Sequence, residues 1–576
     1  MNLNEHPNPQ IQRNFFRLLN GIWEFELGKA EGKYDCPLSG KIEVPYCPES
    51  VLSGIGNTDF ITDCAYSRVV SLREEDLSER LVLHFGAVDY VAAVYVNGRY
   101  VGGHLGGYTA FEFDIAPFCR AGENRITVFV HDNVHENTPS GKQSPQSQPF
   151  GCYYTRTTGI WQSVWLEKTP KIYLRDVKFF PDPEACRVGV ELYLAGEEDR
   201  EVQIEVDVSY EGKIVGRLDA VQKTGREKYE VPLSEKHLWE VGDGKLYDVK
   251  IRCGTDEVIS YFGLRSVRFE GYRFLLNGKS VFQRLVLDQG YYPQGVYTAS
   301  DESDFSRDIS LATDLGFNGA RLHQKVFDPR YLYECDRAGF LVWGEFPSWG
   351  IDYSSLDALG RFLGEWTEAV EQQFNHPSII TWCPLNEVWG GNKIDLRFVE
   401  SVYLLTKTLD STRPCVDCSG GCHGRYTDLY DDHCYVESQT LQAIADVYLS
   451  ETKRLTGKLL PQNATAGNAY DGILPVQISE YGGVVFVAQK TDESGWGYQA
   501  ADSEEEFVAG YEARTSALLS CPVMSGFCYT QLYDVEQEQN GLYTYERKLK
   551  FSKKAQERIR ACNQSLAKIE EEGRER

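Results

Sequence analysis

The stretch Ser378-Ile-Ile-Thr-Trp-Cys-Pro-Leu-Asn386-Glu387 decides the fold, together with its counterpart Pro475-Val-Gln-Ile-Ser-Glu480-Tyr-Gly-Gly483. Each begins with a short apolar run rich in β-branched residues, which indicates a buried strand of a parallel sheet. Each carries a glutamate where that strand should end. In a β/α barrel, side chains at the C-terminal ends of the strands face the active-site cup. The pattern therefore predicts two facing carboxylates, the minimum equipment for hydrolysing a glycosidic bond.

Around these two stretches the chain alternates strands with helices. Amphipathic helices are expected at 304–315, 357–374 and 397–410, and strands at 319–322, 340–344, 379–382, 476–478 and 525–530. Repeated strand–helix units over about 300 residues are typical of a TIM barrel. We therefore predict a (β/α)8 catalytic barrel over residues 263–576.

The first 262 residues have a different rhythm, with short strands separated by turn signals and without helical periodicity. Residues 1–170 predict a β jelly roll, and the Asn97-Gly98 pair marks one of its hairpins. Residues 171–262 predict an immunoglobulin-like β sandwich that carries no catalytic pattern. The polar loop 137–148 is long enough to be either functional or disordered, and it serves either its own barrel or a neighbour's.

The composition limits the possible partners. The 576 residues carry a net charge of −26, which argues against nucleic acid or an anionic membrane as the main partner. We find no signal peptide and no membrane-spanning run, so a soluble, cytoplasmic protein is expected. The 16 cysteines are then expected to be reduced thiols.

One cysteine cluster raises the question of a metal. Cys415-Val-Asp-Cys418-Ser-Gly-Gly-Cys422-His423 contains half of a zinc motif, but a second half is not cleanly present. The same run fits a barrel strand that continues into its loop. We therefore predict no metal site and no cofactor.

Several motifs, in this order, resemble glycoside hydrolase family 2, which contains β-galactosidases, β-glucuronidases and β-mannosidases. They cover nearly the whole chain: Leu19-Asn-Gly-Ile-Trp23, Thr158-Gly-Ile-Trp-Gln-Ser-Val-Trp-Leu-Glu167, Gly263-Leu-Arg-Ser266, Asn375-His-Pro-Ser378 with Asn386-Glu387, and Gly526 to Arg547. The resemblance implies a retaining exo-β-glycosidase. It assigns Glu387 as general acid/base, Glu480 as nucleophile and Asn386 as the residue that grips the sugar 2-hydroxyl.

Each carboxyl group needs its own environment. Glu387 must hold a proton near neutral pH, which requires an apolar or acidic neighbourhood that raises its pKa, and Trp382, Leu385 and Trp389 are candidates for the apolar part. Glu480 must stay ionised, and a hydrogen bond from Tyr481 or Tyr435 would favour that state.

Further substrate-binding candidates lie at other expected strand ends. Arg321 and His323 match the family's Asn-x-x-Arg region, with the histidine displaced by one position, and Lys325 follows in the same stretch. Trp349 and Tyr533 are expected as sugar-stacking platforms, although packing of the barrel top explains each of them equally well. Asp288 and Gln289 are expected to bond sugar hydroxyls.

Three departures from the family bear on the substrate. The stretch Leu285-Val-Leu-Asp-Gln-Gly-Tyr-Tyr292 replaces the family's Gly-Val-Asn-x-His-Glu. Gly344-Glu345-Phe-Pro-Ser-Trp349 lacks the extra glutamate and histidine of the magnesium-dependent members. The asparagine–lysine pair that binds a uronic acid carboxylate in β-glucuronidases is also missing, and Glu536 and Glu538 stand in that region.

Two acids there would repel a substrate carboxylate, so a terminal galactose-like sugar is favoured. Two alternatives remain. One is a β-galacturonidase or β-glucuronidase that uses Lys325 or Arg547 for the carboxylate; the other is a catalytically inactive carbohydrate-binding protein. The expected partners are a carbohydrate substrate and further copies of the chain in a homo-oligomer.

Overall fold

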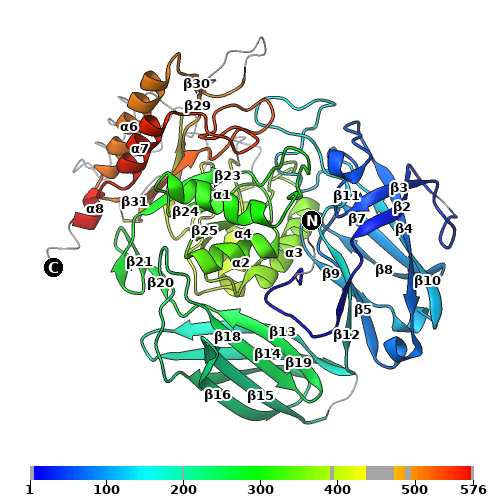
Figure 1. The fold of residues 1–576 in the computed structure, drawn as a ribbon. Helices are drawn as coiled ribbons and strands as arrows, with labels where there is room; N and C mark the ends of the chain where they lie inside the picture. Colours follow the sequence, from blue (N-terminus) through cyan, green and yellow to red (C-terminus); the bar gives the residue numbers. More distant parts are fainter. Residues whose placement is uncertain are drawn as a thin grey trace.

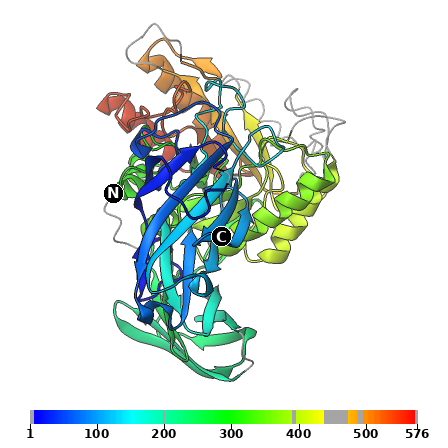
Figure 2. The same cartoon turned by 90° about the vertical axis from the view of Figure 1, so that its right-hand side faces the viewer.

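The computed structural model describes residues 6–30, 32–196, 200–388, 395–435, 473–486 and 495–571. Figure 1 shows a central barrel with one all-β body beside it and a second all-β body below. The view from the side shows the first body lying along the barrel (Figure 2). The fold is the predicted multidomain combination, and we propose domain boundaries at 1–170, 171–262 and 263–576.

The first body is a sandwich of two antiparallel sheets. One has the order β3-β2-β4-β10-β7-β8 and the other β1-β12-β5-β9. Their inward-facing residues, such as Trp23, Tyr66 and Phe85, are almost fully buried and form one apolar core. The strands are β1 (Phe16–Leu18), β2 (Gly21–Leu27), β3 (Gly40–Val44), β4 (Asp63–Leu72), β5 (Arg80–Phe85), β6 (Val88–Asp89), β7 (Val91–Val96), β8 (Arg99–Leu105), β9 (Phe111–Asp114), β10 (Gly122–His131), β11 (Gly159–Ile160) and β12 (Val164–Thr169).

The second body packs a three-stranded sheet, β13-β14-β17, on a four-stranded sheet, β16-β15-β18-β19. Alternate residues of β15, among them Ile204, Val206 and Val208, are buried between the sheets, as a half-buried strand requires. The strands are β13 (Ile172–Asp182), β14 (Arg187–Gly196), β15 (Val202–Tyr210), β16 (Lys213–Gln222), β17 (Gly225–Pro232), β18 (Tyr247–Cys253) and β19 (Asp256–Phe262).

The barrel wall is a parallel sheet with the order β26-β25-β24-β23-β31-β28-β27. An eighth segment, 414–419, extends the wall beyond β26 through parallel bridges from Trp382 to Cys415 and from Asn386 to Ser419. The Ser419 hydroxyl donates to Asp431 of β27 (2.8 Å), which closes the ring. The strands are β23 (Gln283–Asp288), β24 (Gly319–Leu322), β25 (Leu341–Glu345), β26 (Ile379–Cys383), β27 (Tyr430–Cys434), β28 (Val476–Gly482) and β31 (Met524–Thr530).

Helices cover the outside of this wall. Helix α3 shows why they form: the Ser355 side chain caps its first turn at Ala358, and Phe362 and Trp366 one turn apart face the barrel. The helices are α1 (Ser303–Asp314), α2 (Pro329–Ala338), α3 (Leu356–Gln373), α4 (Leu396–Leu409), α6 (Glu504–Leu519), α7 (Lys553–Asn563) and α8 (Lys568–Glu571). Short strands complete the domain: β20 (Val267–Glu270), β21 (Arg273–Leu276), β22 (Lys279–Ser280), β29 (Val484–Val485) and β30 (Gln499–Ala500).

A loop of the first body, residues 137–155, lies on the barrel of the same chain. We call it the strap; it is the cyan segment above the barrel in Figure 1. The backbone N–H groups of Ser140 and Gly141 donate to the Trp349 carbonyl (2.8 and 3.2 Å). The Asn137 side chain accepts from the Asp352 N–H (2.5 Å). The strap therefore serves its own barrel in this structure.

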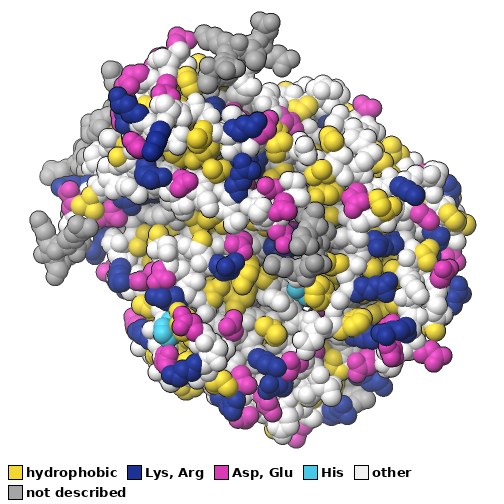
Figure 3. Space-filling model, in the orientation of Figure 1, with side chains coloured by type: hydrophobic (Ala, Val, Ile, Leu, Met, Phe, Trp, Pro, Cys, Tyr) yellow, Lys and Arg dark blue, Asp and Glu magenta, His cyan; other side chains and the backbone are white. Residues whose placement is uncertain are grey.

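Charges are mixed over the molecular face drawn in Figure 3, where acidic and basic side chains alternate. None of the helices that the structure describes has the length and apolar character needed to cross a membrane.

The strap leads to a prediction at Gly141. Its backbone is left-handed (φ +58°), and a Cβ there would lie 2.5 Å from the Gln324 carbonyl oxygen. Gly56 has a similar φ (+64°) and nothing within 4 Å of its Cβ position, so Gly56→Ala is a matched control. Both substitutions should cost about 1 kcal/mol for the backbone, and Gly141→Ala roughly 1–3 kcal/mol more for the clash. Calorimetric melting of the two variants measures the difference; equal melting temperatures would contradict this packing.

Candidate active site

Two glutamates and a histidine meet at the C-terminal edge of the barrel. Glu387 follows β26, Glu480 lies in β28 and His433 in β27. One carboxylate oxygen of each glutamate and a ring nitrogen of His433 lie within 4.8 Å of one another. Glu387 has a left-handed backbone (φ 46°), held by a hydrogen bond from its N–H to the Ser419 carbonyl (2.8 Å). The predicted pair of facing carboxylates is therefore present.

Glu480 is surrounded by donors that favour its charged form. Arg321 Nη1 donates to its Oε1 (2.8 Å), and the Tyr435 hydroxyl donates to its Oε2. Burial would raise the pKa of this carboxyl, but the positive charges of His433 and Arg321 outweigh burial and lower it below its usual value. Glu480 is thus an ionised carboxylate near neutral pH.

Glu387 is paired with His433. The Glu387 Oε1 and His433 Nδ1 atoms are 2.7 Å apart. Burial raises the Glu387 pKa, yet the hydrogen bond and charge of His433, together with the charge of Lys142, bring it below its ordinary value. Burial conversely lowers the pKa of His433, but Glu480 and Glu387 raise it above 6.5. The pair holds one proton, mainly on the imidazole.

This arrangement corrects the predicted environment of Glu387. An apolar or acidic neighbourhood was expected, but the His433 imidazole contacts the carboxylate. The Trp382 indole instead donates to Asp410 (2.8 Å), and Leu385 belongs to the barrel core. Trp389 lies outside the described residues. The prediction of a raised Glu387 pKa is therefore wrong, because the contact with His433 lowers it.

Arg321 forms hydrogen bonds with several groups of the site besides Glu480. Its Nε donates to Glu345 (2.6 Å), and its Nη2 donates to the Asn386 side-chain oxygen. His323 Nδ1 lies 3.0 Å from Glu345, at an angle too poor for a hydrogen bond. Burial and the charge of Lys142 lower the His323 pKa, which keeps that ring neutral. Arg321 thus holds the Glu345 and Glu480 carboxylates in place, and the neutral His323 ring lies beside them.

Asn386 offers a donor to a ligand. Its side-chain oxygen is occupied by Arg321, while its buried Nδ2 has no hydrogen-bond partner among the described residues. A buried donor without a partner costs free energy unless a ligand or water satisfies it. The group fits the predicted contact with a sugar hydroxyl.

Aromatic rings form two sides of the site. The Trp349 indole donates to the Asn386 carbonyl (3.2 Å) and lies 5.1 Å from the Tyr153 ring of the strap. Tyr435 stacks on Tyr498 with centroids 3.5 Å apart. Flat aromatic faces suit the apolar faces of sugars, but the Lys142 ammonium already lies 4.0 Å from the Trp349 ring centroid, so the role of Trp349 as a platform stays a prediction.

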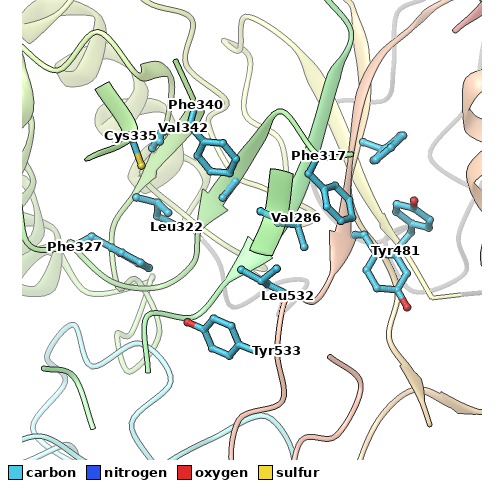
Figure 4. Packing of buried hydrophobic residues seen from close by; sticks show 14 of the residues in the cluster. Val286, Phe317, Leu322, Phe327, Cys335, Phe340, Val342, Tyr481, Leu532 and Tyr533 are labelled. Carbon is cyan, nitrogen blue, oxygen red and sulfur yellow. The ribbon is translucent and has the colours of Figure 1, made fainter. Parts of the chain in front are cut away.

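Tyr481 lies on the other side of the wall. Its hydroxyl bonds Thr515 of α6 (2.8 Å), and its ring packs in the hydrophobic cluster of Figure 4. Neighbouring residues of a strand point to opposite faces, so Tyr481 cannot share the face of Glu480. Tyr435 provides the predicted tyrosine hydrogen bond instead.

Asp288 and Tyr533 are hydrogen-bonded to each other. The Asp288 carboxylate accepts from the Tyr533 hydroxyl, the Tyr331 hydroxyl (2.9 Å) and the Gly290 N–H (2.9 Å). Arg547 covers the Tyr533 ring at 3.6 Å. Tyr533 is part of the buried packing in Figure 4, so it offers no free face for a sugar. The expected substrate contacts of Asp288 and Tyr533 do not fit this geometry, because their polar atoms and faces are already engaged.

The two basic side chains that were expected to bind a substrate carboxylate, Lys325 and Arg547, already have partners within the protein. The Lys325 ammonium donates to the carbonyls of Gly290 (2.5 Å) and Tyr297 (2.8 Å), and burial lowers its pKa to about 7. Arg547 forms a two-point ion pair with Asp308 (3.1 and 3.0 Å). Neither group is free to bind a substrate, which corrects the expectation for Lys325 and Arg547.

Gln289 is linked to the site indirectly. Its Nε2 donates to Gln531 (2.8 Å), which donates to Asn540 (2.8 Å), which in turn donates to Glu538 (2.9 Å). Gln289 Oε1 is buried and has no partner within the described ranges. It therefore keeps a free acceptor, and its contact with a sugar hydroxyl stays a prediction.

His433 and Lys142 were not predicted from the sequence as residues of the catalytic site. His433 alternates with Asp432 and Cys434 along β27, so the period of a strand could have placed it in the barrel. Lys142 lies on the strap, and only tertiary structure brings it beside Trp349, with its Nζ 4.0 Å from the ring centroid.

Glu387, His433 and Glu480 are close enough together to hold a cation. A metal-binding histidine must be neutral, so the raised pKa of His433 would oppose metal binding, and the absence of a metal site stays a prediction. Cys415 and Cys418 are free thiols in the eighth wall segment, and burial raises the pKa of both. The wall position agrees with the alternative of a strand running into its loop.

Two family models match the chain. Residues 29–170 match the sugar-binding domain of glycosyl hydrolases family 2, and residues 267–482 match the TIM barrel domain of the same family. The fold and the barrel-edge carboxylates define a multidomain barrel glycosidase. The chain belongs to glycoside hydrolase family 2.

Relatives and solved structures in this family agree with the match. A β-glucuronidase of Streptococcus agalactiae is 27% identical over 429 residues, which cover 68% of this chain and 70% of the relative. A β-glucuronidase structure from Bifidobacterium dentium, complexed with coumarin-3-O-glucuronide, superposes with a TM-score of 0.80 at 20% identity, covering 95% and 97% of the two chains. A β-galacturonidase structure from Eisenbergiella tayi bound to glycerol gives 0.74 at 21% identity, covering 97% of each.

The Glu387–His433 pair gives a direct prediction. Replacing Glu387 by Gln removes a charge that raises the His433 pKa, so the imidazole should titrate at lower pH. NMR of protein labelled with ¹⁵N-histidine measures this titration. Glu205→Gln, on the exposed face of the second body, makes the same chemical change away from the site. It should leave the pH of the His433 titration unchanged. A His433 titration unchanged in Glu387→Gln would contradict the pairing.

Proposed function

We propose that the protein is a retaining exo-β-glycosidase that removes a terminal β-linked uronic acid by double displacement. The observation that carries the retaining mechanism is the closeness of the two carboxylates, whose nearest oxygens lie within 4.8 Å. Retaining enzymes hold the two groups about 5–5.5 Å apart, and inverting enzymes about 6.5–9.5 Å apart to admit a water.

The roles follow from the surroundings of each group. Glu480, ionised by Arg321 and Tyr435, attacks the anomeric carbon and forms a glycosyl–enzyme bond. The glycosidic oxygen leaves with the proton that Glu387 and His433 share. Glu387 then removes a proton from water, which displaces Glu480 and regenerates both groups. Asn386 Nδ2 would bond the sugar 2-hydroxyl in these steps.

The sugar class departs from the galactose-like expectation. That expectation treated Glu536 and Glu538 as acids that repel a substrate carboxylate. Both carboxylates instead bind the strap: Glu536 accepts from the Thr155 N–H (3.1 Å) and Glu538 from the Tyr154 hydroxyl. Several similar proteins are named β-glucuronidase or β-galacturonidase, which supports a uronic acid, although a β-galactosidase is also among the similar proteins.

An exo mode fits the closed side of the site. The strap and the 536–538 segment are joined by Gln537, whose Nε2 donates to the carbonyls of Gly151 (2.8 Å) and Tyr153 (2.9 Å). A barrel mouth closed on one side accepts the end of a glycan more readily than its middle. Assembly into a homo-oligomer stays a prediction.

The nucleophile assignment can be tested by substitution. Glu480→Gln should lower kcat on a p-nitrophenyl β-uronide by several orders of magnitude, because the covalent step loses its nucleophile. Glu505→Gln, on the surface of α6, is the control for the same chemical change. Proton NMR of the first sugar released by the wild type should show the β-anomer. An α-anomer, or wild-type turnover in Glu480→Gln, would refute double displacement.

The pH profile tests the hydrogen bond to Glu480. Tyr435→Phe removes a donor to the carboxylate, so the Glu480 pKa should rise. Activity requires the ionised form, and the acidic limb of kcat/KM should therefore move about one unit to higher pH. Tyr481→Phe alters the neighbouring residue, whose hydroxyl bonds Thr515, and should leave the limb unchanged. If the acidic limbs of wild type and Tyr435→Phe fall at the same pH, Tyr435 does not stabilise the ionised form of Glu480.

A further inference from the structure

The site has three cations beside its carboxylates, and they differ in what they already bind. Arg321 donates to Glu480, Glu345 and Asn386. His433 is paired with Glu387. Lys142 has only the face of Trp349 under its ammonium, at 4.0 Å, and in the described part of the chain it donates no hydrogen bond and forms no ion pair. Lys142 therefore retains its donors for a ligand.

The backbone of Lys142 is fixed although its ammonium is free. The Lys142 carbonyl accepts from the Tyr154 N–H (2.8 Å), and the Ser144 N–H donates to the Tyr154 carbonyl (2.9 Å). The Gln143 side chain, next in sequence, donates to Asp89 (2.7 Å) and to the Tyr108 hydroxyl (3.0 Å) in the first body. Anchors on both sides hold the lysine over the barrel, which reduces the entropy lost when it binds a ligand.

The ammonium is electrostatically coupled to the reacting groups. Burial would lower the Lys142 pKa, but nearby groups, Cys152 first and then Glu538, Glu480 and Glu387, raise it above its usual value. Its charge in turn opposes the effect of burial on Glu538. Lys142 is thus a permanent positive charge close to both catalytic glutamates.

Glu538 completes this part of the site. Its oxygens accept from Tyr154 and Asn540, and burial raises its pKa despite Lys142 and these two hydrogen bonds. A carboxyl that takes up a proton more easily repels an anion less. From the sequence alone, Glu538 was expected to repel a uronic acid. In the structure it instead binds the strap that carries Lys142.

We propose that Lys142 is the receptor for the C6 carboxylate of a terminal β-linked uronic acid. The proposal deepens the proposed function and rests on it. The first body then supplies the group that distinguishes a uronic acid from the neutral sugar of the same stereochemistry. The barrel supplies the groups that cleave the bond.

The test uses two substrate pairs that differ only at C6: p-nitrophenyl β-glucuronide with β-glucoside, and β-galacturonide with β-galactoside. Wild-type kcat/KM should favour the uronide in at least one pair. Lys142→Met keeps the aliphatic stem over Trp349 and removes the charge. It should lower the uronide-to-neutral ratio about 10- to 100-fold, the loss expected for a charged hydrogen bond. Lys142→Arg, which keeps the charge, should retain part of the preference.

Lys41→Met, an exposed lysine of the same body, is the matched control and should keep the wild-type ratio. Melting temperatures of all variants check that the fold is retained. Binding gives a second readout: galacturonate or glucuronate should raise the melting temperature of wild type more than that of Lys142→Met.

The outcomes separate the two proposals. A ratio unchanged in Lys142→Met, with equal uronate stabilisation, overturns the role of Lys142 and leaves the uronidase proposal standing. Preference of the wild type for the neutral member of both pairs overturns the uronic acid class, while retention of configuration would still support double displacement. No hydrolysis of any of the four glycosides refutes the proposed function itself.

Discussion

The buried guanidinium of Arg321 is the constraint on which the site depends. One side chain donates to groups on three other wall positions: Glu345 at the end of β25, Asn386 after β26 and Glu480 in β28. A buried charge is tolerated only when it is paired and hydrogen-bonded, so these strand ends must lie at fixed separations. The same pairing keeps Glu480 ionised and turns the free Nδ2 of Asn386 toward the site. Packing of the barrel and chemistry of the site are thus satisfied by one set of contacts.

A second set of contacts joins the site to the first body. The segment 536–538 binds the strap through Thr155, Tyr154 and the carbonyls of Gly151 and Tyr153. Together with the contacts that Ser140, Gly141 and Gln143 make, they hold a long surface loop in one position. The docking of the first body on the barrel therefore determines where Lys142 lies. Among the described residues, no barrel side chain takes its place beside Trp349.

Local patterns allowed much of the fold to be predicted. The run Ile379-Ile-Thr-Trp382 and the expected helix at 357–374 match β26 and α3 to within a residue, because burial and periodicity are local properties. The glutamate pair followed from the same patterns and from the family resemblance. Glu538 was misinterpreted because its partner Tyr154 is 384 positions away. The Glu387–His433 pair, Lys142 and the occupied states of Lys325 and Asp288 likewise depend on distant partners, which one sequence does not reveal.

The strap has a thermodynamic consequence for the assembly of the protein. A ligand held by Lys142 on one side and by barrel groups on the other spans the seam between two bodies. Thermodynamic linkage is reciprocal. If docking of the first body strengthens ligand binding by some free energy, then the bound ligand strengthens docking of the first body by the same amount. The sugar would then act as a cross-link that strengthens the interface while it is bound. Release of the product would return the seam to its weaker state at the end of every turnover.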